Sequence, residues 1–130
     1  MTGDRVLLAH GGGGQLTDSL VNDRIRPRLS NEWLDDLDDS AVLPRPDGDL
    51  VFTTDSYVVQ PLEFPGGDIG RLAVSGTVND LAVCGAEPRW LSLGLVLEEG
   101  LLLATLERVL DSAAECAREA GVAVVTGSRR

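Results

Sequence analysis

Two stretches in the second half of the chain carry regular hydrophobic patterns. Apolar residues recur every three or four positions over residues 102–120, which is the period of an amphipathic helix, and Gly121 is suited to end that helix. A second helix is predicted over residues 68–83, because Asp68 is a favourable N-cap. Between the two, residues 90–97 alternate leucine with other residues, which predicts a strand with both faces at least partly covered.

The first half of the chain predicts shorter elements. A strand is expected over residues 6–9, followed by a helix over residues 15–29 that Pro27 should bend or end early. The remaining predicted strands cover residues 41–43, 50–54, 57–60 and 122–126. This order of strands and helices predicts an α+β fold, a mixed sheet with helices on one face, in a single domain over residues 1–130.

Composition and charge exclude several classes of protein. The 130 residues include 11 basic and 21 acidic side chains, and the net charge of −10 disfavours binding to nucleic acid. All the basic side chains are arginine, so the sequence offers neither a Walker A lysine nor a lysine for Schiff-base chemistry. The longest uncharged apolar stretch is far shorter than the roughly 20 residues of a membrane helix, and no signal peptide is recognised, so a cytoplasmic protein without a membrane partner is expected.

Cysteine and histidine are too few for a zinc site. Cys84 and Cys116 are far apart in the sequence, and His10 is the one histidine. Both cysteines fall in helical apolar patterns and are expected to be small buried side chains. A catalytic triad would have to use His10, and no neighbouring motif supports one.

A run of four glycines lies between the first predicted strand and the first predicted helix. Such a loop allows backbone N–H groups to approach a phosphate, and the helix N-terminus adds positive potential. The run does not match the dinucleotide-binding fingerprint, because Leu16 and Thr17 stand where the last glycine would be needed. A phosphate-binding loop and a flexible connector both remain open for Gly11, Gly12, Gly13 and Gly14.

Three acidic residues are candidates for holding a metal ion, because each lies beside a hydroxyl or amide side chain. They are Asp39 before Ser40, Asp55 after Thr54 and Asp80 after Asn79. Mg²⁺ binds through a few carboxylates and completes its shell with phosphate oxygens, so the acids and the glycine loop together suggest a magnesium–nucleotide site. The alternatives are a turn cap, a strand end and a solvated helix face.

Several segments in order resemble the N-terminal domain of the HypE family, the carbamoyl dehydratases that help to mature nickel–iron hydrogenases. The most specific are Phe-Pro-Gly-Gly-Asp-Ile-Gly at 64–70 and Gly-Thr-Val-Asn-Asp-Leu-Ala at 76–82. The sequence is also similar to the wider superfamily of AIR synthetase, selenophosphate synthetase and thiamine-monophosphate kinase. The resemblance implies an AIR-synthetase-like N-terminal domain that binds ATP and Mg²⁺ and forms a homodimer.

The resemblance also implies roles for residues and partners. It assigns Asp39, Asp55 and Asp80 to Mg²⁺, Thr54 and Asn79 to the neighbourhood of the phosphates, and Gly11 to Gly14 to a loop over the nucleotide. The family takes a carbamoyl group from a HypF-type carbamoyltransferase onto a cysteine at its extreme C-terminus. ATP then drives dehydration to a thiocyanate, and the cyanide passes to the hydrogenase iron through HypC-type and HypD-type scaffold proteins.

The sequence departs from the family pattern at its end. After the Val-Val-Thr-Gly at 124–127, Ser128 stands where the family has an acid and Arg130 where it has a lysine. Neither Cys84 nor Cys116 occupies the place of the acceptor cysteine, so no catalytic residue is assigned. We expect a truncated form that lacks the second domain of the family and is inactive alone. There are two alternatives: another ATP-dependent enzyme of the superfamily, such as a small-molecule kinase, and a non-catalytic dimerisation module. The motif at 64–70 favours the HypE family over another enzyme of the superfamily.

Overall fold

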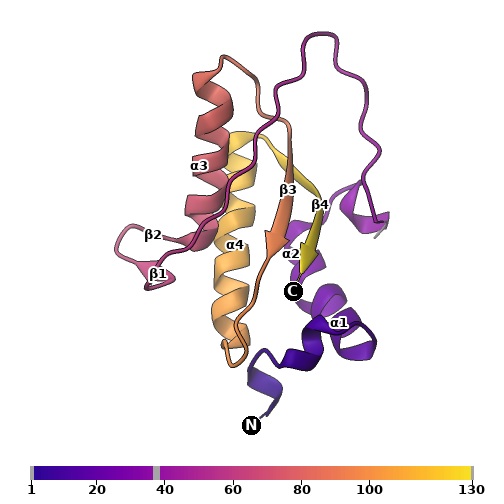
Figure 1. Cartoon of the computed structure of the whole chain (residues 1–130), viewed down its shortest axis with the longest axis vertical. Coiled ribbons are helices and arrows are strands. Elements are labelled where there is room, and N and C mark those ends of the chain that lie inside the picture. Colours follow the sequence, from indigo (N-terminus) through magenta and orange to yellow (C-terminus); the bar gives the residue numbers. More distant parts are fainter. Residues whose placement is uncertain (1, 37–38, 130) are drawn as a thin grey trace.

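The computed structural model describes residues 2–36 and 39–129 and has a β-α-β unit at its centre (Figure 1). Strand β3 (Trp90–Leu95) leads through helix α4 (Leu103–Ala120) to strand β4 (Ala123–Arg129), and the two strands pair in parallel. Helix α3 (Ile69–Val83) lies against α4 on the same side of the strands. The expected combination of helices covering one face of a sheet is confirmed, with the strands arranged as two separate pairs.

Helix α4 supplies most of the hydrophobic core. Its apolar positions face α3 and the strands, and Leu110, with 1% of its surface exposed, is the most deeply buried of them. Gly121 ends the helix in the left-handed conformation, at φ 70°, where a side chain would be strained. The predicted helix and its stop signal are confirmed. The buried residues of α4 are Leu103, Leu106, Leu110, Ala113, Ala114, Cys116 and Ala117.

Helix α3 begins where the sequence predicts. The carboxylate of Asp68 accepts a hydrogen bond of 2.9 Å from the backbone N–H of Arg71 and so caps the first turn. Near this end α3 touches α4 closely, because a Cβ added at Gly70 would lie 3.0 Å from the carbonyl carbon of Val109 and even closer to its oxygen. Gly85, at φ 74°, follows the end of the helix.

The predicted first helix is continuous but changes its winding. Helix α1 (Gln15–Ser19) passes into the π-helical segment η3 (Leu20–Ile25) and then into helix α2 (Arg26–Leu29). Pro27 lies in the first turn of α2, a position that tolerates proline, so it does not end the helix early. Among residues 2–36 and 39–129, no helix is both long and apolar enough to cross a membrane.

Ion pairs hold the N-terminal helical segments against α4. Glu107 accepts hydrogen bonds from Arg24 and from Arg28, the latter at 3.0 Å, and Arg28 also lies 2.9 Å from Asp111. These pairs are partly buried, so they are less screened by solvent than ordinary surface pairs. The helix that follows the glycine loop is therefore anchored at its C-terminal half.

The strand predicted over residues 6–9 is wrong. Arg5 forms one isolated bridge with Leu102, after which the chain turns into the 3-10 segment η2 (Leu8–Gly11). Val6 still exchanges backbone hydrogen bonds of 2.7 Å with Leu101 and Gly100, and the pairing stops there because the antiparallel partner turns at Gly100, which has a φ of 89°. The other 3-10 segments are η1 (Thr2–Asp4) and η4 (Leu34–Asp36).

The strands predicted between residues 41 and 60 are also wrong. This segment is extended but has no strand partner within the described residues, and it leads into a small hairpin of β1 (Glu63–Phe64) and β2 (Gly67–Asp68). Several of its apolar side chains are exposed to solvent, at 90% for Val42, 83% for Phe52 and 94% for Val58. A short apolar run forms a strand only where a second backbone is present to pair with it.

Both faces of β3 are partly covered, as expected: on the face opposite α4, Trp90 is half-buried, with its ring centre 6.5 Å from that of Trp33. Leu91 is buried and Leu93 half-buried on the side of α4, whereas Ser92 and Gly94 on the opposite face are exposed. Past the end of the strand, Val96 is 92% exposed. Strand β4 is longer than predicted.

Candidate functional site

The glycine loop lies at the end of the molecule that carries the N-terminus, between η2 and α1 (Figure 1). Gly13 and Gly14 have φ values of 83° and 82°, so this turn requires glycine at both positions. All four glycines are exposed. Gly11 and Gly12 line a hollow of about 530 Å³ together with apolar side chains, His10 and Glu99.

The base of this loop is closed by two hydrogen bonds to His10. The backbone N–H of Leu7 donates to His10 Nδ1 at 2.8 Å, and the buried hydroxyl of Thr17 donates to the carbonyl oxygen of His10 at 2.8 Å. The one histidine therefore has a structural role at the loop, which the sequence pattern did not indicate.

The extended segment before the hairpin runs antiparallel to α3. Near the start of the helix, the backbone N–H of Ile69 donates to the carbonyl of Leu62 at 2.9 Å. Further along, the hydroxyl of Tyr57 lies 3.4 Å from Oγ1 of Thr77. The residue number therefore falls along the segment as it rises along the helix, and the two lie side by side (Figure 1).

This antiparallel run relates two of the predicted site motifs. An extended chain advances about 3.3 Å per residue and a helix about 1.5 Å, so two residues back from Tyr57 correspond to about four residues further along α3. Counted from Thr77, Asp55 comes to about the level of Leu81, one residue past Asp80, and Thr54 lies further toward the C-terminal end of α3. The candidate side chains on the two elements are all exposed: Thr54, Asp55, Asn79 and Asp80. Asp55 accepts only a local hydrogen bond, from the N–H of Ser56 at 2.7 Å.

Asp39 and the glycine loop are placed differently. Asp39 is exposed and begins the second described stretch of the chain. The glycine loop lies at the opposite end of the molecule from the C-terminal end of α3 (Figure 1). Within the described residues no three or more histidine, cysteine, aspartate or glutamate side chains gather as a metal site, and no ion pair involves Asp39, Asp55 or Asp80. The roles assigned to these residues stay predictions.

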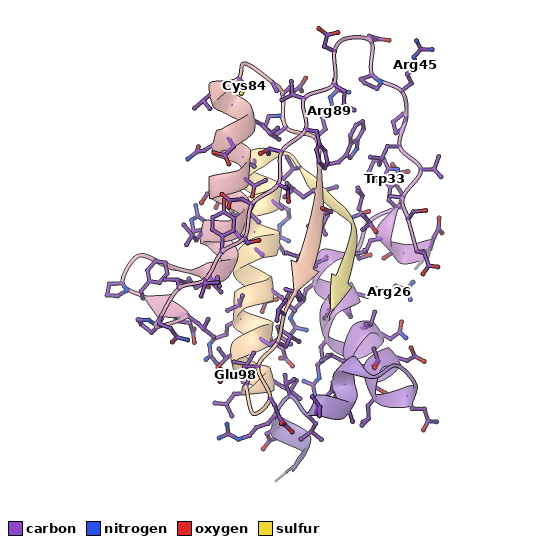
Figure 2. The ribbon with its side chains drawn as sticks, in the orientation of Figure 1. Arg26, Trp33, Arg45, Cys84, Arg89 and Glu98 are labelled. Atoms are coloured by element: carbon purple, nitrogen blue, oxygen red, sulfur yellow. The ribbon has the colours of Figure 1, made fainter. Side chains whose placement is uncertain are left out.

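The two cysteines have different environments. Cys116 is buried in α4, and this burial raises the pKa of its thiol, as expected for a structural side chain. Cys84 is exposed at the C-terminal end of α3 (Figure 2), so the expectation of burial is wrong for it. The helix ends at Val83, and the apolar pattern that suggested burial does not continue past it.

Comparison with known proteins identifies the family. Residues 37–129 match the family described as AIR synthase related protein, N-terminal domain. The chain belongs to this family. Over 125 residues it is 50% identical to carbamoyl dehydratase HypE of Azotobacter vinelandii. The alignment covers 96% of this chain and 37% of that protein. The AIR synthase-related chain thus spans less than two fifths of the length of the curated HypE relatives that it matches.

Solved structures agree with this assignment. The structure of hydrogenase maturation protein HypE in complex with ATP matches 95% of this chain and 37% of its own, with a TM-score of 0.92 and 50% identity. A HypE–HypF complex matches 86% of this chain and 36% of its own, with a TM-score of 0.62 and 42% identity. The AIR synthase N-terminal fold expected from the motifs is confirmed.

Proposed function

We propose that this chain is the nucleotide-binding N-terminal part of a HypE-like carbamoyl dehydratase. The observation that carries the proposal is the similarity, at 50% identity and a TM-score of 0.92, to a HypE structure that is in complex with ATP. That likeness extends over 95% of this chain. The role of the chain is then to bind and orient ATP.

In this proposal Asp55 and Asp80 hold Mg²⁺ together with Asp39. Their fit to the ion rests on two observations. The three carboxylates are exposed and make no ion pair within the described residues, and the antiparallel run brings Asp55 and Asp80 to about the same level of α3. Mg²⁺ takes one or two protein carboxylates and completes its shell with phosphate oxygens and water, so a cage of protein ligands is not required. When bound, the ion would neutralise charge on the phosphates of ATP.

The neutral groups beside these acids have a complementary role. Thr54 and Asn79 carry hydrogen-bond donors that suit phosphate oxygens, and Gly11 to Gly14 offer backbone N–H groups that no side chain shields. The glycine loop lies at the end of the molecule opposite the C-terminal end of α3, which carries Asn79 and Asp80, so the two are separate contacts to test.

The reaction proposed for the whole enzyme uses ATP to remove water from a carboxamide. The γ-phosphoryl group passes from ATP to the oxygen of a carboxamide carried on a cysteine sulfur, which leaves ADP and releases one proton from the nitrogen. The carbon–oxygen bond then breaks, phosphate departs, and the nitrogen loses its second proton to give the thiocyanate. Neither Cys84 nor Cys116 is assigned as the carrier, and we expect no turnover by this chain alone.

The proposed partners are a HypF-type carbamoyltransferase, HypC-type and HypD-type scaffold proteins, and a second copy of the chain. The matched HypE–HypF complex supports the first. A second copy of the chain is supported by the extended segment, which has no strand partner within the described residues and exposes Val42, Phe52 and Val58. These functions would operate in the cytoplasm.

Titration with Mg-ATP tests the proposed function. The wild-type chain should bind Mg-ATP by calorimetry and melt at a higher temperature as the ligand concentration rises, because ligand binds the folded state. Asp55→Asn and Asp80→Asn should each weaken binding and reduce the Mg²⁺ dependence. Asp49→Asn is the matched control, since it removes the same charge from an exposed acid on the same segment. Binding that is equal in all the variants would overturn the metal assignment.

A non-catalytic dimerisation module is the second candidate, favoured by the same exposed apolar side chains. It predicts self-association of the wild-type chain with no response to Mg-ATP at any concentration tested. Association together with nucleotide binding supports the first proposal instead.

A further inference from the structure

Tyr57 is the side chain that joins the Asp55 segment to α3. Its hydroxyl lies 3.4 Å from Oγ1 of Thr77, and its ring rests on Gly76. A Cβ added at Gly76 would lie 2.9 Å from two ring carbons of Tyr57 and closer still to the hydroxyl oxygen. The ring therefore occupies the space that any larger residue at position 76 would fill.

Glycine in the interior of a helix needs a reason. It costs about 0.5–1 kcal/mol of stability relative to alanine, and Gly76 lies in the middle of α3 with an ordinary helical backbone. The three nearest atoms that a Cβ there would meet all belong to the side chain of Tyr57. The glycine thus serves the docking of Tyr57 and not the helix itself.

The position of this contact relates it to the candidate site. Tyr57 is two residues from Asp55 in the sequence, and Gly76 is three and four residues, about one helical turn, from Asn79 and Asp80. Within the described residues, the segment makes no ladder hydrogen bonds that would otherwise fix its position at this level. Displacing the ring would therefore move Asp55 relative to Asp80.

We propose that Tyr57, seated on Gly76, is a positioning residue that sets the separation of Asp55 and Asp80 for Mg-ATP. This inference rests on the proposed function. Gly76→Ala should displace the ring and misplace one carboxylate, which weakens Mg-ATP binding by about tenfold to a hundredfold, the usual effect of disturbing a residue that orients a metal ligand. The melting temperature of the ligand-free chain should change little, because the helix preference for alanine offsets the lost contact of the ring.

The chain contains one tyrosine, which allows a direct probe of the contact. Protein labelled with 3-fluorotyrosine should give one ¹⁹F resonance, and Gly76→Ala should shift it toward the position seen in urea. Tyr57→Phe, studied without the label, keeps the ring and should bind Mg-ATP nearly as the wild type does. Gly48→Ala is the matched control, since a Cβ there meets nothing within 4 Å.

The outcomes separate this inference from the proposed function. A wild-type chain that does not bind Mg-ATP overturns both. Normal wild-type binding with an unshifted ¹⁹F resonance in Gly76→Ala overturns the docking contact. A shifted resonance with unchanged Mg-ATP affinity overturns the positioning role and leaves the proposed function standing.

Discussion

Arg108 on α4 holds the carboxylate of Glu63 on the small hairpin through two hydrogen bonds, of 2.9 Å from Nε and 2.8 Å from one terminal nitrogen. The two residues are 45 positions apart in the sequence, so the pair fastens the start of the hairpin to the central helix. This bond lowers the pKa of Glu63 below the ordinary value of 4.5, with the hydrogen bond from Arg108 as the largest cause.

This pair predicts a dependence of stability on pH. Because the pKa of Glu63 is lower in the folded chain than in the unfolded one, its contribution is present above the ordinary value of 4.5 and is lost as the pH falls through the folded pKa. Glu63→Gln should therefore melt at a slightly lower temperature than the wild type at pH 7, and the two should converge at pH 3 by calorimetry. Glu98→Gln, which changes an exposed acid that makes no ion pair within the described residues, should melt as the wild type does at pH 7. An equal difference at both pH values would contradict the assignment.

The crossing of α3 and α4 predicts a large effect at Gly70. Any Cβ at this position would meet the backbone of Val109 and lie 3.2 Å from the backbone nitrogen of Ala113, and a rigid helix backbone does not yield as a side chain would. Gly70→Ala should destabilise the chain by about 1–3 kcal/mol, the usual cost of overpacking. Urea unfolding followed by circular dichroism measures this. Gly48→Ala should have little effect; a Gly70→Ala chain as stable as the wild type would show that the helices do not approach this closely.

Elements that depend on their own sequence were predictable. The heptad-like spacing of α4, the Asp68 cap of α3 and the stop at Gly121 act within a few residues, and each is confirmed. The extended segment from 41 to 60 was not predictable, because short apolar runs do not say whether a partner backbone is present to form a strand.

The candidate site shows the same limit. Motifs selected Asp55 and Asp80, but their relation depends on an antiparallel run between distant segments, which spacing along the chain does not encode. The docking of Tyr57 was missed, although a glycine in the middle of a predicted helix was a usable signal for a close contact at position 76.

The environments of the two cysteines predict unequal reactivity. The thiolate is the reactive form, and burial both raises the pKa of Cys116 and limits access to it, whereas Cys84 is exposed. With iodoacetamide at pH 8, mass spectrometry should find Cys84 modified well before Cys116. Cys84→Ser should leave only the slow reaction, and urea should make the two sites of the wild type react alike. Equal rates in the folded chain would show that Cys116 is not protected.

The exposed apolar segment predicts self-association, and Phe52 is the side chain that tests it. Phe52 is 83% exposed between other uncovered apolar residues on an extended chain with no strand partner among the described residues. An unpaired extended backbone with apolar side chains is suited to pairing with another copy, which buries the side chains and satisfies the N–H and C=O groups together. Light scattering of the wild type at micromolar concentration should give a mass above the 13.8 kDa of one chain, increasing with concentration. Phe52→Ser should shift the distribution toward one chain.

Val83→Ser is the matched control, because Val83 is also 83% exposed but lies at the end of α3, outside the segment. A wild-type mass of 13.8 kDa at every concentration, or an equal loss of association in both variants, would contradict the role of the segment.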